Sequence, residues 1–148
     1  MKVKIVLILI LFNFITSCSN EETDTSISFT NISKNALGGN GLEGISSSNL
    51  VIKTNTEWED LISQVNTLEN FSENFSEISI DFNEYMLIAV FLEVKTYGSE
   101  VEITQIIETT SELIVSAQET ENPVITNVIT QPFHIVKVIK SDKSVVFE

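Results

Sequence analysis

The sequence predicts an α+β fold that is mainly antiparallel β, either a small sheet or sandwich or a partial barrel, with one packed helix. Three observations carry this prediction. Short stretches rich in β-branched and aromatic residues alternate with turn residues through most of the chain, as in an antiparallel sheet. A nearly continuous apolar run at residues 85–94 is typical of a central strand. One stretch repeats its apolar residues at helical spacing.

The first strand is expected at Ser26 to Ile32, where apolar residues alternate loosely with polar ones. Ala36 to Gly44 follows and holds four of the five glycines. A phosphate-binding glycine loop opens a helix and carries a lysine and a hydroxyl residue. No lysine follows here, and Asn49 to Lys53 looks like a strand. We therefore interpret the glycine stretch as a turn or mobile loop.

The helix is predicted to begin at Thr56, because Thr56-Glu57-Trp58-Glu59 matches a capping box. The acidic residues in this stretch also favour a helix start, where the helix dipole is positive. Trp58, Leu61, Ile62 and Val65 recur at three- and four-residue spacing and form one apolar face. We expect these four side chains in the core.

A four-residue unit, Glu69-Asn70-Phe71-Ser72, is repeated directly as Glu73-Asn74-Phe75-Ser76. The spacing could place both phenylalanines on one helical face, since residues four apart are neighbours there. The segment could equally be a loop held down by the two rings. The sequence leaves both interpretations open.

The rest of the chain has the pattern of strands. Ser99 to Glu108 and Ser111 to Gln118 alternate or nearly so, with a predicted hairpin turn between them. Glu121-Asn122-Pro123 is expected to break the chain again. Further short strands are predicted at Val124 to Thr130, Phe133 to Lys140 and Ser144 to Phe147.

Residues 1–17 have the layout of a lipoprotein signal peptide. Two lysines, Lys2 and Lys4, precede an apolar run from Ile5 to Ile15, and small residues end the segment. The run is about half of the ~20 residues that a membrane-spanning helix needs. An exported, cleaved leader is therefore a better interpretation than a transmembrane anchor.

Cys18, the only cysteine, follows this leader directly. Ile15-Thr16-Ser17-Cys18 resembles a bacterial lipobox, and the resemblance implies that Cys18 is acylated and attaches the protein to a lipid membrane. We expect residues 18–26 to be a lipidated acidic tether and residues 27–148 a single β-rich domain. The acidic pair Glu21-Glu22 resembles a tag for the outer face of the outer membrane, although a flexible linker explains it as well. The expected location is the bacterial outer membrane, with the periplasmic and cell-surface faces both open.

The charge balance excludes one class of partner. After Cys18 the chain has six lysines, no arginine and 21 acidic residues, a net charge of −15. Nucleic-acid binding needs basic side chains that neutralise phosphates. No nucleic-acid partner is therefore expected, whereas an acidic surface suits solubility or a cationic partner.

Several segments resemble one known family. Asp81-Phe82, the run MLIAVFLEV, the stretch KTYGSEVEI, the stretch VITNVITQPFHIVKV and the closing SVVF are similar to the PrcB C-terminal domain. This β-rich domain of bacterial lipoproteins is named for an accessory subunit of a surface protease complex. The similarity covers roughly Thr54 to Phe147. It implies an accessory, partner-binding role, with an envelope protein or a protease as partner, and no catalytic activity.

The predicted partner-binding residues are Tyr97, Gly98, Gln131 and Pro132. Lys95 to Ser99 is expected to be a turn in which Gly98 has a positive φ, a conformation that glycine adopts without steric cost. The loop Gln118 to Pro123 and the stretch around Gln131 and Pro132 would lie near it. Prolines stiffen a loop and lower the entropy lost on binding, and Tyr97 combines ring area with a polar tip.

No enzyme is predicted. The single histidine, His134, lies in a strand pattern, where a packed or edge position is expected, and an acylated Cys18 leaves no Cys/His pair. Neither a metal nor a cofactor is expected, because ligand spacings for zinc and calcium are missing, although the many carboxylates leave a paired-carboxylate hydrolase open. The alternative function is a small-molecule or polysaccharide-binding module, for which Tyr97 would be the exposed ring.

Overall fold

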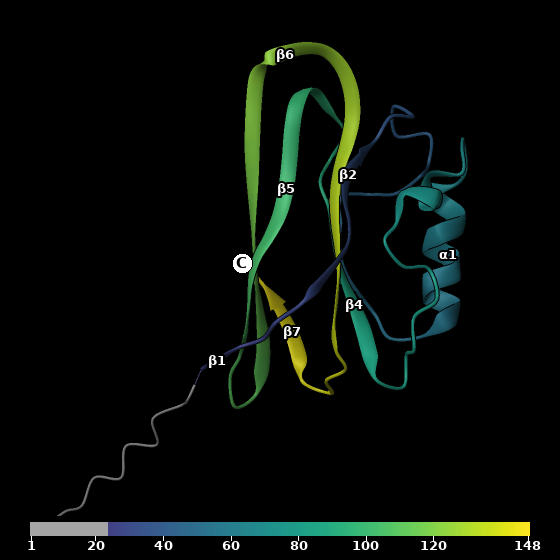
Figure 1. Cartoon of the computed structure of the whole chain (residues 1–148). Helices are drawn as coiled ribbons and strands as arrows, with labels where there is room; N and C mark the ends of the chain where they lie inside the picture. The colour runs from purple at the N-terminus through teal and green to yellow at the C-terminus, as the bar shows by residue number, and fades with distance from the viewer. Residues whose placement is uncertain (1–23) are drawn as a thin grey trace, which may run out of the picture.

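In the computed structural model the residues described are 24–148, apart from the side chains of Pro123, Ile125 and Thr126. These residues form a seven-stranded, mainly antiparallel sheet and one α-helix. The sheet bends along its longest strands, so that its two halves face each other as a nearly closed barrel, and the helix covers the outer side of one half (Figure 1). The predicted β-rich α+β class is therefore confirmed.

The two halves are here called sheet A and sheet B. Sheet A contains β1, β5, β7 and the first part of β6, and sheet B contains β2, β3, β4 and the last part of β6. The strands are β1 (Thr25–Ser26), β2 (Thr30–Leu37), β3 (Ser48–Ile52), β4 (Tyr85–Phe91), β5 (Lys95–Glu108), β6 (Glu112–Ile139) and β7 (Ser144–Phe147). The helical elements are α1 (Asn55–Val65) and a 3-10 turn, η1 (Phe71–Asn74).

β6 connects the two sheets. Its first residues pair with β5 on one side and with β7 on the other, and residues 131–139 pair with β2 and β4. The β6–β7 pairing is parallel, and the other pairings among the described strands are antiparallel. One strand of 28 residues therefore holds both halves of the barrel together.

β4 is buried on both faces, which explains its unbroken apolar sequence. Met86, Ile88 and Val90 belong to the core between sheets A and B. The alternate residues Leu87, Ala89 and Phe91 belong to a second core between sheet B and α1. Successive strand residues point to opposite faces, so a strand between two cores must be apolar throughout. The central strand predicted at residues 85–94 is confirmed over Tyr85–Phe91, and residues 92–94 lie beyond its end.

The predicted helix is present, but its cap lies two residues earlier than the sequence analysis placed it. Thr54, in extended conformation, accepts from the backbone N–H of Glu57, whose carboxylate accepts from the N–H of Thr54 at 3.0 Å. Thr54-Asn55-Thr56-Glu57 is thus the capping box. Two overlapping boxes exist in the sequence, and the structure uses the first, so the prediction of a cap at Thr56 is wrong. Trp58, Leu61 and Val65 are buried as predicted.

The repeated phenylalanines hold a loop against the core. Phe71 begins η1 and Phe75 follows its end, and both rings are buried. Each packs edge-on against Phe133 of β6, with ring centroids 5.7 and 6.3 Å away. Of the two interpretations that the sequence left open, the structure supports a short 3-10 turn and loop anchored by the two rings.

The N-terminal strand prediction is corrected. The chain pairs with β5 at Thr25–Ser26, leaves sheet A, and pairs with β6 of sheet B only from Thr30 onward. The expected strand at Ser26 to Ile32 therefore spans the crossing between the two sheets. The glycine stretch after β2 forms the predicted turn region, in which Gly41 and Gly44 have positive φ.

Candidate functional site

The candidate site is an arch formed by residues 95–102 of β5 and residues 118–130 of β6, called here the β5–β6 arch. In Figure 1 it rises above the rest of the barrel. Tyr97 pairs with Thr126, but the next residue, Gly98, pairs with Asn122. Residues 123–125 therefore have no partner in β5 and form a bulge, and bulges bend the strand that carries them. At this bend β6 passes from sheet A to sheet B.

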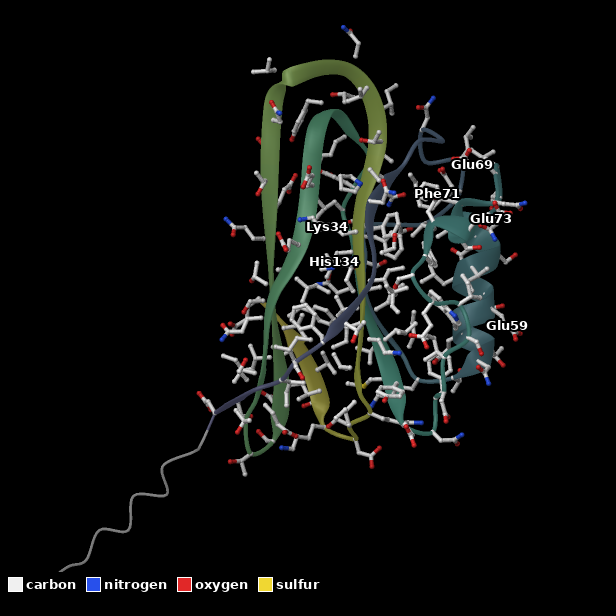
Figure 2. All side chains as sticks on the ribbon, viewed as in Figure 1. Lys34, Glu59, Glu69, Phe71, Glu73 and His134 are labelled. Carbon is white, nitrogen blue, oxygen red and sulfur yellow. The ribbon has the colours of Figure 1, made fainter. Side chains whose placement is uncertain are left out.

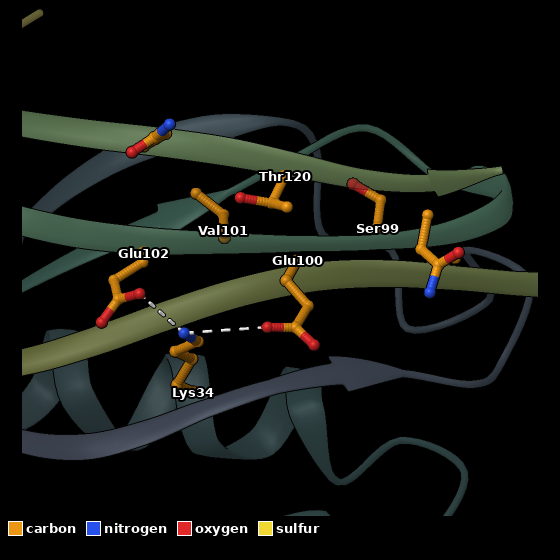
Figure 3. A pocket seen from close by; sticks show the side chains of 9 residues that line it. Lys34, Ser99, Glu100, Val101, Glu102 and Thr120 are labelled. Carbon is orange, nitrogen blue, oxygen red and sulfur yellow. Dashed lines mark hydrogen bonds and ion pairs between the residues drawn. The ribbon is translucent and has the colours of Figure 1, made fainter.

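One side of the arch carries a groove of about 320 Å³. Lys34 of β2 forms one wall, and β5 and β6 supply the rest, with hydroxyl, amide and carboxylate groups (Figure 3). Polar groups that converge in a concave site can orient a polar ligand or the side chains of a partner. The arch residues with polar side chains in the lining are Ser99, Glu100, Glu102, Gln118, Thr120 and Asn122.

Lys34 links β2 to β5 across this groove. Its Nζ lies 2.9 Å from a carboxylate oxygen of Glu102 and 3.7 Å from one of Glu100. The hydrogen bond to Glu102 raises the pKa of Lys34, and the same bond lowers the pKa of Glu102. Both groups are therefore charged at neutral pH, and the groove presents one cation between two anions.

His134 lies beneath the groove and joins the two sheets. Its Nδ1 accepts from the backbone N–H of Ile103 at 2.7 Å, and Nε2 lies 3.1 Å from Oδ1 of Asn31. Because Nδ1 accepts, the proton resides on Nε2, which donates to Asn31. Burial lowers the pKa of the imidazole, so it is neutral at pH 7. His134 is a packed strand histidine, as predicted.

A second polar network lies along the arch around Lys95 and Tyr97. The buried Lys95 ammonium is 2.9 Å from Glu119 and 3.3 Å from Glu93, and it lies 5.9 Å from the Tyr97 ring centroid. The Tyr97 hydroxyl donates to Glu121 at 2.7 Å, and this hydrogen bond raises the pKa of the tyrosine. The hydrogen bond to Glu119 raises the pKa of Lys95 well above its usual range.

The structure brings together only two of the predicted partner-binding residues. Tyr97 is half-buried in β5, and Gly98 lines the groove of the arch. Gln131 is only 1% exposed, and its amide donates to the backbone carbonyls of Ile45 and Leu92. Pro132 is also buried. Neither of the last two side chains is open to a partner in this conformation.

The turn and loop expected around these residues are corrected. Lys95 to Ser99 is part of β5, and Gln118 to Pro123 is part of β6. Gly98 pairs with Asn122 within the ladder and is not among the glycines with positive φ. Cys18 lies outside the described residues, so its predicted lipid attachment stays a prediction.

Sequence reasoning missed the ion pairs of the arch. Glu100 and Glu102, and likewise Glu119 and Glu121, are two residues apart, and residues at this spacing share a face of a strand. That spacing was available as a signal. The partner Lys34 lies 68 residues from Glu102, and nothing local to either residue indicates the contact.

The comparisons with known proteins give no relative: no family model, no curated protein and no solved structure matches the chain. The resemblance to the PrcB C-terminal domain therefore stays a prediction. Within residues 24–148, no group of three or more histidine, cysteine or acidic residues has the arrangement of a metal site. In the same part of the chain, no helix has the length and apolar character needed to cross a membrane.

Proposed function

We propose that this protein is a non-catalytic lipoprotein of the bacterial outer membrane, anchored through acylated Cys18, which serves as an accessory or interaction subunit of an envelope complex. The partner would be another envelope protein, for which the resemblance to the PrcB C-terminal domain suggests a protease. The leader-like residues 1–17 and the lipobox-like sequence before Cys18 support the anchoring.

The observation that carries the interaction role is the position of the β5–β6 arch. The chain enters the fold at β1, which pairs with Ile107 and Glu108 at the far end of β5 from Tyr97. At ~3.3 Å per strand residue, these points are roughly 30 Å apart. A membrane anchor before β1 would thus leave the tip of the arch directed away from the bilayer, where a partner could reach it (Figure 1).

The surface of the arch suits protein recognition. Val124 is 87% exposed and Ile129 is 45% exposed near the bend, and burial of this apolar surface against a partner would favour association. The groove below them holds more carboxylates than ammonium groups. We expect a partner surface that is apolar at its centre and basic at its margin.

Co-purification from detergent-solubilised envelopes tests this proposal. Tyr97→Ala and Glu121→Gln should each reduce recovery of the partner, because the first removes the ring and the second removes the negative charge of the group that accepts the Tyr97 hydrogen bond. Glu84→Gln, an exposed position far from the arch, serves as the control. The melting temperature should change little in all three variants. Recovery of the wild-type protein alone, or an equal effect of Glu84→Gln, would contradict the proposal.

The groove also favours the alternative of a small polar ligand or oligosaccharide. Its amide and hydroxyl groups resemble those that orient sugars, and Tyr97 supplies one half-buried ring on the same arch. Thermal-shift measurements with cell-wall fragments and oligosaccharides distinguish the two functions. A shift that Thr120→Val removes would support ligand binding, and a flat response to all compounds would eliminate it.

A further inference from the structure

β3 is an edge strand that lies away from the arch. It pairs with β4 along Ser48–Ile52 and ends the strand order on its side of the sheet. Among the described residues no other strand pairs with its outer edge. The outward N–H and C=O groups of such a strand are a template for another extended chain.

This edge lacks the protection that β-sheet proteins usually give to free strands. Residues 45–52, ISSSNLVI, contain neither a charged residue nor proline, which are the common means of preventing strand addition. β2 offers a contrast within the same sheet, because its Lys34 forms ion pairs with β5. The open edge of β3 is therefore suited to pairing.

A groove of about 350 Å³ runs between β3 and α1. Leu50, Ile52 and Leu61 contribute apolar surface to it. Its helical rim consists of Glu57, Asp60 and Gln64, whose spacing of three and then four residues places them on one side of α1. Backbone pairing at the strand and side-chain pockets beside it are the two components of peptide recognition by strand addition.

The rim of this groove is acidic. Glu57 and Asp60 line it, and no lysine does. The backbone N–H of Lys53 hydrogen-bonds to the Glu57 carboxylate and lowers its pKa, so Glu57 is anionic at neutral pH. Basic side chains would be favoured beside these carboxylates, and acidic ones would be repelled.

We infer that the outer edge of β3, with the β3–α1 groove, binds an extended segment of another protein by β-strand addition, and that this segment carries both apolar and basic residues at every second position, the positions that face α1. Its apolar side chains contact Leu50 and Leu61, and its basic side chains face Glu57 and Asp60. The five residues of β3 match a segment of about the same length. This surface is separate from the β5–β6 arch and does not depend on the function proposed above.

The test is selection of peptides from a random displayed library on the full-length chain in mild detergent. We expect enrichment of sequences in which every second residue, on the side that faces α1, is apolar or basic. Synthetic copies of the enriched peptides should bind about tenfold more weakly to Asp60→Lys, because the charge reversal places like charges together. The matched control is Glu59→Lys, which makes the same charge change on the outer side of α1 (Figure 2) and outside the groove, and should bind as the wild type does.

Hydrogen exchange of the bound peptide complex identifies the mode of binding. The amides of β3 should gain protection, whereas those of the arch should not. Enriched peptides without basic and apolar residues at every second position, equal weakening by both lysine variants, or unchanged exchange in β3 would overturn the inference. Sedimentation of the chain alone tests a competing occupant: a dimer whose formation protects the β3 amides would show that a second copy of this chain covers the edge instead.

Discussion

At the scale of single residues, His134 shows how a polar side chain is accommodated inside a β core. Both ring nitrogens have partners, one from the backbone of β5 and one from Asn31 of β2. A buried polar group without such partners destabilises a fold by about 1–3 kcal/mol. The histidine therefore contributes to holding the two sheets in register, and its titration becomes coupled to folding.

We predict that the stability of the protein falls more steeply than that of His134→Gln as the pH is lowered from 7 to 5. Burial lowers the folded-state pKa of His134 below its usual value near 6.5, with a smaller contribution from Lys34, while Glu102 acts in the opposite direction. The unfolded chain consequently binds the proton first, which favours unfolding as the pH falls through that value. Glutamine can retain one acceptor and one donor at this position but does not titrate.

Urea denaturation at several pH values measures this difference. The slope of stability against pH for the wild type should exceed that of the variant by at most ~1.4 kcal/mol per pH unit, the limit for one proton. Parallel curves for the two proteins would mean that His134 keeps its ordinary titration in the folded state.

At the scale of the elements, the sequence signals for α1 and β4 were sufficient, but those for β6 were not. The apolar residues recur at helical spacing around Trp58 and form an unbroken run in β4, and in both elements these are the residues that the core buries. Each signal is therefore contained within its own element. Pro123 was interpreted as a break because proline cannot donate to a ladder. The structure places it in the unpaired bulge of β6, where no ladder bond is lost. Such a bulge depends on the register with β5, which local sequence does not reveal.

The position of the helix cap gives a prediction at this scale. Thr54→Ala should lower the free energy of unfolding by about 1 kcal/mol, since the alanine cannot accept from the first helical turn. Thr56→Ala should be neutral or slightly stabilising, because Thr56 is an exposed residue within the first turn, where alanine has the higher helix propensity. Urea denaturation of both variants decides between the two capping boxes. A larger loss of unfolding free energy for Thr56→Ala than for Thr54→Ala would show that Thr56 is the cap.

β6 provides a second prediction, because one strand contains both a fully buried ring and an exposed aliphatic residue. Phe133 is 0% exposed and packs against Phe71, Phe75 and Phe91. Phe133→Ala should destabilise the protein by about 3–5 kcal/mol through lost burial and a cavity. The control Ile139→Ala, at a position that is 70% exposed, should change stability by less than about 0.5 kcal/mol. Equal losses would show that strand pairing, not ring packing, dominates at β6.

At the scale of the whole molecule, the candidate site depends on contacts that join distant parts of the chain. Tyr97 and Gly98, two of the predicted partner-binding residues, belong to the arch. An aromatic ring and a glycine can be recognised from the residue type alone, without knowledge of the fold. The sequence also selected Gln131 and Pro132, which are buried where β6 enters sheet B. A strand residue faces a core where the second sheet packs against it and a groove where that sheet is absent. The position of the second sheet depends on the fold and cannot be predicted from the sequence around the residue.

The last prediction concerns the attachment of this fold to a membrane. Cys18→Ser should abolish incorporation of labelled palmitate and move the protein from the membrane fraction to the soluble fraction. Each buried methylene contributes roughly 0.8 kcal/mol, so two acyl chains hold a protein on a bilayer where one binds only reversibly. The control Ser19→Ala changes the neighbouring residue but keeps the cysteine and the residues before it, and it should still be labelled. Label on the Cys18→Ser protein, or its retention on membranes after a high-salt wash, would show that another feature anchors the chain. The arch would then have no defined direction relative to the bilayer, and the interaction role would rest on the exposed surface of the arch alone.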